Sequence, residues 1–209
     1  MLPFVPPAVA CEESVYAALP IPPAGEDGRG YVDGVFTEKG VALVGARLTL
    51  KSRWPYEAWR RELLRPEHHD EWQPKEFGNE LAEAIDPRHL YLRANVGFLF
   101  DAVQVRRQLV AEITLVDTAS LFRSCWHNVD PAPFRERLAG LVTDAPWEKA
   151  IYGGWDVTPA PGGGTTVSYQ WWIGSAGLPV AVQRWAIGRT LPALLAAYEA
   201  HVGDEVSRR

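Results

Sequence analysis

The pattern that most constrains this chain is a series of segments with alternating apolar and polar residues, followed by one long amphipathic segment at the C-terminus. Alternation of period two is typical of β-strands with one buried face, and it occurs at residues 41–50, 89–96, 104–116, 121–129 and 167–173. Residues 179–201 instead repeat apolar residues at helical spacing, with Pro192 expected to kink the helix. This order predicts an α+β fold, in which a curved antiparallel sheet wraps around one terminal helix.

Three shorter helices are expected between residue 31 and that terminal one. Trp54-Pro55 begins the first, because proline suits the first helical position, and Pro66 ends it. A second helical piece is expected at Glu80–Ile85. The third is a short amphipathic helix over Phe134–Val142, where Phe134, Leu138 and Leu141 recur at helical spacing.

The sequence indicates one main domain with short extensions. Residues 1–30 are rich in proline and glycine and are interpreted as an N-terminal arm with a short helix near Glu12–Leu19. Residues 31–204 form the expected ligand-binding domain, and residues 205–209 form a tail. A chain of 209 residues is long enough to bury a sizeable core.

Composition excludes several classes of protein. The formal net charge of −5 argues against a general nucleic-acid binder, which would carry a basic face. Two cysteines, Cys11 and Cys125, are too few for a disulfide-built scaffold, and their spacing does not tell whether they meet. The nine tryptophans stand out, since such rings either fill a solid core or line a wide cavity.

Neither a secretory signal nor a membrane span is expected. The first residues are apolar but lack a basic region and contain three prolines. The uncharged stretch at residues 157–183 is broken by proline and glycine. A cytoplasmic location is therefore expected, or a periplasmic one if a signal was removed, with at most transient membrane contact.

Three motifs follow one another in the C-terminal third: Gly154-Trp155-Asp-Val-Thr-Pro159, then Gly162-Gly-Gly-Thr-Thr-Val-Ser-Tyr169, then Gly177-Leu-Pro179. Their order and spacing resemble the StAR-related lipid-transfer (START) family. Trp54–Trp59 and Glu71–Pro74 are similar to that family's early helix and Trp-Asp motif, although Gln73 replaces the Asp. The central region around residues 96–101 lacks the family's prolines and arginine. The resemblance is thus to a divergent bacterial member.

The resemblance implies a helix-grip fold, with a cavity between the curved sheet and the long terminal helix. It also implies an apolar small-molecule partner such as a sterol, a phospholipid or a polyketide. Ligand cavities run to about 300–1,000 Å³ and are mostly apolar. Apolar burial contributes roughly 25 cal/mol per Å², so such a ligand needs no charge contact to bind.

Two strands carry arginines whose orientation the sequence leaves open. Arg107 shares a face with Leu109 and Ala111, so it would contact a ligand in the cavity. Alternatively, it pairs with an acid such as Asp101 or Asp117, or a bulge or register shift turns it to solvent. In the next strand, Arg123 and His127 lie on one face and Trp126 on the other. Only one set can face the cavity, and we favour Trp126.

The strongest cavity candidates lie beside the terminal helix. Tyr169 and Trp171 are expected to line one wall, and Leu178, Val182 and Trp185 the other, although ordinary core packing explains them nearly as well. The helix carrying Phe134, Leu138 and Leu141 is either a lid over the cavity mouth or an insertion packed on the surface.

No motif for catalysis, phosphate binding or metal binding emerges. Adjacent His68 and His69 point in different directions on a helix, so neither a metal nor another cofactor is expected. The leading hypothesis is a binder or carrier of a hydrophobic small molecule. One alternative is an enzyme resembling the polyketide aromatase/cyclases, with Arg107, His127 and Tyr169 as candidates. The other is a protein-interaction module with a filled interior.

Overall fold

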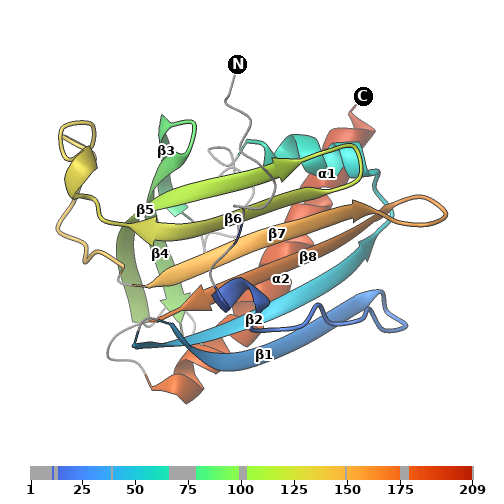
Figure 1. Cartoon of the computed structure of the whole chain (residues 1–209), viewed down its shortest axis with the longest axis horizontal. Coiled ribbons are helices and arrows are strands. Elements are labelled where there is room, and N and C mark those ends of the chain that lie inside the picture. The colour runs from blue at the N-terminus through green and yellow to red at the C-terminus, as the bar shows by residue number, and fades with distance from the viewer. Residues whose placement is uncertain are drawn as a thin grey trace.

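Figure 1 presents the computed structural model of the chain, which describes residues 11, 14–38, 40–65, 79–98, 103–148, 150–174 and 179–208. The elements are the 3-10 helices η2 (Ser14–Ala17) and η5 (Ala132–Phe134), the α-helices α1 (Tyr56–Leu63) and α2 (Val180–Ser207), and the strands β1 (Arg29–Glu38), β2 (Val41–Ser52), β3 (Asn79–Asp86), β4 (His89–Phe98), β5 (Val103–Asp117), β6 (Phe122–Val129), β7 (Ile151–Pro159) and β8 (Thr165–Ile173).

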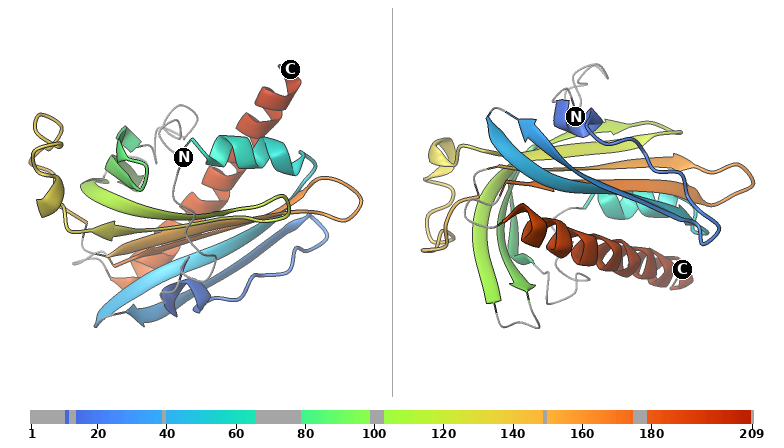
Figure 2. Two further views of the ribbon diagram at one scale, coloured as in Figure 1. Left: turned by 45° about the horizontal axis from the view of Figure 1, so that its top comes forward. Right: turned by 90° about the horizontal axis from the view of Figure 1, so that it is seen from below.

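The strands form one eight-stranded antiparallel sheet in the order β1-β2-β8-β7-β6-β5-β4-β3. Strands β2 and β8 are neighbours although more than a hundred residues separate them. The last two strands, β7 and β8, therefore lie in the middle of the sheet, between β2 and β6. Figure 2 shows the sheet bending at the β4–β3 end around the long helix α2. The expected curved antiparallel sheet wrapped around a terminal helix is therefore confirmed.

Helix α2 packs its apolar stripe against the concave face of the sheet. Its buried apolar residues recur at helical spacing along most of its length, and they are Ile187, Leu191, Leu194, Leu195, Tyr198 and Val202. The helix continues through Pro192 and ends at Ser207. Residues 205–207 of the expected tail are thus helical.

The region expected to be helical at Glu80–Ile85 is instead strand β3. It pairs with β4 through a turn in which the Asp86 carboxylate accepts hydrogen bonds from the backbone N–H groups of Arg88 and His89 at 2.9 and 3.0 Å. Pairing along the hairpin satisfies the backbone groups of the segment and outweighs a weak helical spacing. The helical prediction was wrong.

The N-terminal segment covers the convex face, opposite α2 (Figure 2). Val15 and Leu19 are buried there against Leu43 and Trp172. The Tyr16 hydroxyl donates a hydrogen bond to the Trp126 carbonyl at 2.9 Å. The expected boundary at residue 30 falls inside β1, because this strand begins at Arg29.

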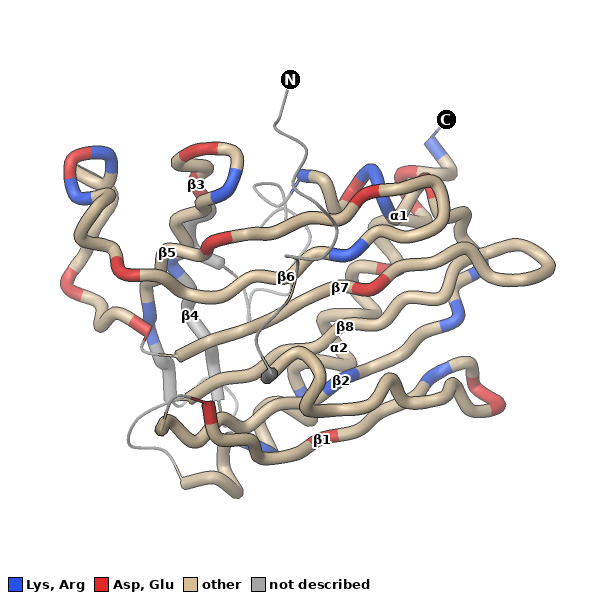
Figure 3. The backbone as a smooth tube through the Cα atoms, in the orientation of Figure 1, with Lys and Arg blue, Asp and Glu red and all other residues tan. Residues whose placement is uncertain are grey.

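Charged residues are frequent in the turns at the ends of the sheet and along α1 (Figure 3). The central strands β7 and β8 carry a single one, Asp156 on the convex face. It accepts hydrogen bonds from Arg123 and from Arg47, whose Nη2 lies 2.5 Å from Asp156 Oδ2. The concave sides of β7 and β8 are therefore free of charged side chains.

Candidate functional site

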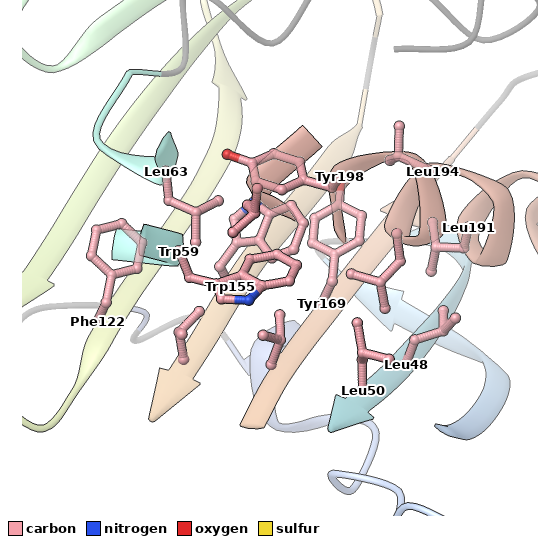
Figure 4. Packing of buried hydrophobic residues seen from close by; sticks show 14 of the residues in the cluster. Leu48, Leu50, Trp59, Leu63, Phe122, Trp155, Tyr169, Leu191, Leu194 and Tyr198 are labelled. Carbon is pink, nitrogen blue, oxygen red and sulfur yellow. The ribbon is translucent and has the colours of Figure 1, made fainter. Parts of the chain in front are cut away.

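One half of the concave face is a solid core. Here α1 and the C-terminal half of α2 pack against β2, β7 and β8 (Figure 4). The rings of Trp155 and Tyr169 stack with centroids 4.1 Å apart, and the Tyr198 ring lies 5.1 Å from Trp155. On its other side Tyr198 stacks with Trp59 at 5.4 Å. Closely stacked rings leave this half filled.

The other half of the concave face is apolar but less completely covered. Leu109 and Ala111 of β5 and Ile151 of β7 are buried, and the side chains of Leu92, Trp126 and Trp171 pack around them. These last three side chains remain partly exposed, although they lie on the face that the sheet turns towards α2. Large apolar side chains left accessible on the inner face form the candidate functional site.

Trp126 lies across Gly153 on this inner face. The two residues are partners in the β6–β7 register, and a Cβ on Gly153 would lie 2.1 Å from Trp126 Cζ2. Glycine is therefore the residue that lets this indole lie close to the strand. Trp171 of β8 pairs with Gly153 from the opposite side. Two tryptophans thus flank one glycine in a row across three strands.

Trp171 carries a buried polar atom at this site. Its Nε1 is shielded from solvent, and no hydrogen-bond partner for it exists among the described residues. The register explains this, because the neighbours of Trp171 across the sheet are Ala46 and Gly153, neither of which has a polar side chain. A buried indole N–H usually finds a partner.

Arg107 lies on the inner face by strand alternation with Leu109. Its Nε is 3.6 Å from Oε2 of Glu148, whose side chain is only 4% exposed. The Arg107 guanidinium also donates from Nη1 to the backbone carbonyl of Arg106 at 2.9 Å. Its acidic neighbour is thus Glu148, which the sequence analysis did not single out. Asp117 instead pairs with Arg60, and Asp101 lies outside the described residues.

Arg123 and His127 lie on the convex face, away from Trp126. Arg123 pairs with Asp156, and His127 Nε2 is 4.0 Å from Glu112 Oε2. Because side chains alternate along β6, Phe122 and Trp126 face α2, whereas Arg123 and His127 face the other side of the sheet. Arg123, a candidate ligand-binding residue, therefore lies on the face opposite the candidate site.

Tyr169 is fully enclosed in the solid half of the concave face. Burial alone raises the pKa of its hydroxyl far above the ordinary value, which keeps the group protonated. The three residues considered for acid–base catalysis therefore do not meet. His127 lies on the convex face, Tyr169 is in the core, and Arg107 is beside Glu148.

Val182 and Trp185 do not close the opposite wall. Their side chains are 41% and 45% exposed, and the Arg189 guanidinium lies 5.8 Å from the Trp185 ring centre. The buried stripe of α2 passes through Gln183 and Ile187, roughly half a helical turn away from Trp185. The expectation that Val182 and Trp185 line this wall is therefore corrected. Leu178 lies outside the described residues.

The segment expected to be a lid packs on the convex face. Leu138 is buried against Tyr91 and Val110, with Phe134 and Leu141 beside it. Only residues 132–134 form a helical turn, a 3-10 helix, and turns follow it, so the predicted amphipathic helix was wrong. The Tyr91 hydroxyl also donates to the Leu141 carbonyl at 3.2 Å. These contacts hold the segment away from the concave side and correct the lid interpretation.

Neither a metal site nor a membrane span is found within the described ranges. Those residues contain no group of three or more His, Cys, Asp or Glu side chains that could hold a metal ion. Neither of the α-helices described, α1 and α2, is long and apolar enough to cross a membrane. The pair His68 and His69 lies outside the described part of the chain.

A curved antiparallel sheet gripping a long C-terminal helix defines the helix-grip class of fold. No family model matches this sequence. No curated protein matches it either. Solved structures do match, and the chain has the fold of START domains. The STAR-related lipid transfer protein from Xanthomonas axonopodis is similar with a TM-score of 0.62 at 15% identity, over 85% of this chain and 95% of that chain.

Two further solved structures have the same fold. Human StAR-related lipid transfer protein 5 is similar with a TM-score of 0.57 at 14% identity, over 82% of this chain and 86% of that chain. A START superfamily protein from Mycobacterium smegmatis gives a TM-score of 0.54 at 13% identity, over 78% and 97% of the two chains. Identities this low demonstrate the shared fold, which is a divergent form of the START architecture.

Proposed function

We propose that this protein binds one hydrophobic small molecule, of the lipid or sterol class, between α2 and the less covered half of the concave face. The observation that carries the proposal is the partial exposure of Trp126 and Trp171 on an inner face whose other half is solidly packed. A ligand covering these rings gains roughly 25 cal/mol for each Å² of apolar surface removed from water. The START-like fold supports a ligand of this class.

The charge distribution supports an uncharged or weakly polar ligand. Among the described residues of the site, the charged groups are Arg107 and Glu148, which neutralise one another at 3.6 Å. A buried anionic headgroup would need a cation of its own to offset the cost of leaving water. We therefore expect apolar surface, rather than charge, to supply most of the affinity.

Binding of fluorescent lipids tests the proposal. Purified protein is titrated with dehydroergosterol and with an NBD-labelled phosphatidylcholine, and co-purified molecules are extracted for mass spectrometry. Saturable binding of one lipid, weakened in Trp126→Ala, is expected. Trp185→Ala is the matched control, because this ring is exposed on the outer side of α2. Absence of saturable binding, or equal loss in both variants, would contradict the proposal.

We propose further that the protein works in an oxidising compartment rather than in the cytosol first expected. Cys11 and Cys125 form a disulfide. Disulfides persist in secreted and periplasmic proteins and are rare in cytosolic ones. Trapping free thiols with a maleimide in intact cells of the source organism tests this, and full labelling of both cysteines would overturn it.

A further inference from the structure

The proposal made here deepens the proposed function and rests on it. We propose that the bound molecule carries an uncharged hydrogen-bond acceptor, a carbonyl or hydroxyl oxygen, and that the indole N–H of Trp171 donates to it. The site would thereby select oxygen-bearing lipids over plain hydrocarbons. Trp171 is a specificity-determining residue in this proposal.

The first support is the state of the indole nitrogen. Trp171 Nε1 is buried and lacks a hydrogen-bond partner among the described residues. A donor that is withdrawn from water without a new partner is costly to the fold, so buried donors of this kind are uncommon. A ligand oxygen at this position would satisfy the donor.

The second support is the surroundings of the ring. Ala46 and Gly153 flank Trp171 across the sheet, and Tyr169 and Ile173 are its neighbours along β8 on the same face. Tyr169 is stacked on Trp155 in the solid core. The sheet itself therefore offers no polar side chain at hydrogen-bond distance from the indole, and an acceptor has to come from outside the sheet.

A comparison with Trp59 separates this site from a mere packing defect. Trp59 Nε1 is also buried without a partner among the described residues. Its side chain, however, is completely enclosed, at 0% exposure, and stacked on Tyr198. Trp171 keeps part of its ring accessible on the inner face, next to Leu109 and Trp126. Of these two tryptophans, Trp171 is the one that combines an unsatisfied donor with a surface that a ligand can reach.

The chemistry of the donor defines the ligand class. An indole N–H donates and cannot accept, and it carries no charge. It therefore recognises a ketone, an ester or an alcohol oxygen, and it contributes nothing to a ligand without an acceptor. Arg107 is already close to Glu148 and is not required for this contact.

Two fluorescent probes of different polarity test the proposal. Prodan, a naphthyl ketone, carries an acceptor, and its emission moves to longer wavelength when its carbonyl is hydrogen-bonded. Diphenylhexatriene is a hydrocarbon without an acceptor. Both are titrated into the wild-type protein, Trp171→Phe and Trp59→Phe. The phenylalanine variants keep an aromatic ring and remove only the N–H and part of the indole.

We expect Trp171→Phe to weaken prodan binding about 2- to 10-fold and to move the emission of the bound probe to shorter wavelength. Diphenylhexatriene should lose less affinity than prodan in Trp171→Phe, because only its apolar contact with the ring is reduced, and its saturable binding verifies that the variant folds. Trp59→Phe should leave both probes unaffected. If prodan binds with the same affinity and emission in Trp171→Phe, the acceptor contact is wrong while the proposed function stands. If neither probe binds the wild-type protein saturably, the proposed function itself fails.

Discussion

Cys11 and Cys125 form a disulfide that ties the N-terminal segment to strand β6, across 114 positions of sequence. The bond lies on the convex face, where Cys125 is 5% exposed among Tyr16, Tyr152 and Trp172. A covalent link between such distant positions restricts the unfolded chain far more than the folded one. The packing of the N-terminal segment on the sheet therefore has a covalent as well as an apolar basis.

Reduction of this disulfide should lower the free energy of unfolding by about 2–5 kcal/mol. The measurement is denaturant unfolding of the protein with and without a reductant, followed by tryptophan fluorescence. The control is the double variant Cys11→Ser/Cys125→Ser, whose unfolding should not respond to the reductant. A midpoint that is identical in the oxidised and reduced wild-type protein would contradict the prediction.

Five of the eight strands and the terminal helix were predictable, because one buried face leaves a clear period in the sequence, whereas β1, β3 and β7 were not predicted by alternation. Strands β2, β4, β5 and β8 alternate strongly, and the final helix has a broad apolar stripe. Strand β7 does not, because Gly153 and Gly154 stand where the alternation would otherwise be visible. Gly153 is required there by the Trp126 ring from β6. The reason for glycine at this position is a contact with another strand, so the sequence of β7 alone does not reveal it.

The candidate site was predictable only in part for a related reason. Alternation indicates which residues share a face, so Trp126 and Arg107 could be grouped correctly with their neighbours. It does not say which face another segment covers. The N-terminal segment and residues 134–141 both cover the convex face, and this makes residues on both sides of the sheet equally apolar. Glu148, the acidic neighbour of Arg107, lies in a loop with no periodic signal at all.

Removal of a buried carboxylate should cost far more than removal of an exposed one. Asp156 is 16% exposed and contacts Arg47, which is 7% exposed and whose pKa is lowered by burial. Asp156→Ala leaves that guanidinium without its carboxylate, so we expect a loss of about 3–5 kcal/mol in unfolding free energy. The control Asp117→Ala removes one of the two carboxylates that pair with Arg60, which is 34% exposed, and should cost at most about 1 kcal/mol. Equal losses in the two variants would contradict the prediction that the buried Asp156–Arg47 pair contributes more to stability than the exposed Asp117–Arg60 pair.

Alkaline pH should destabilise the protein through its tyrosines. Burial raises the pKa of Tyr56, Tyr91, Tyr169 and Tyr198, and burial together with Asp33 raises the pKa of Tyr31 to about 12. The folded state therefore holds these phenolic protons more tightly than the unfolded state. Above the ordinary pKa of about 10 the unfolded chain loses its protons first, so the unfolding free energy falls as the pH rises.

Ultraviolet titration of tyrosinate measures this effect directly. The folded protein should ionise its tyrosines at higher pH than the same chain in concentrated guanidinium, and ionisation of the buried ones should coincide with loss of structure. Tyr31→Phe should remove the component that titrates near pH 12. Superimposable titration curves for the folded and unfolded chains would contradict the prediction.

Gly153 and Gly45 each lie beneath a tryptophan, on opposite faces of the sheet, and substitution should separate their roles. A Cβ on Gly45 would lie 2.2 Å from Trp172, which is 1% exposed, and 2.8 Å from the Trp171 carbonyl. Nothing there can give way, so Gly45→Ala should lower the unfolding free energy by about 1–3 kcal/mol or more.

Gly153→Ala should affect ligand binding more than stability. Its Cβ would meet the nitrogen-bearing side of the Trp126 indole, and this ring is only partly buried, so it can rotate away from the strand. We expect a stability loss of no more than about 1 kcal/mol. The displaced ring would enter the space that we assign to the ligand, so affinity for diphenylhexatriene should fall. Denaturant unfolding and probe titration of both glycine variants measure the two effects. A stability loss as large as that of Gly45→Ala, with affinity unchanged, would mean that Trp126 is ordinary core.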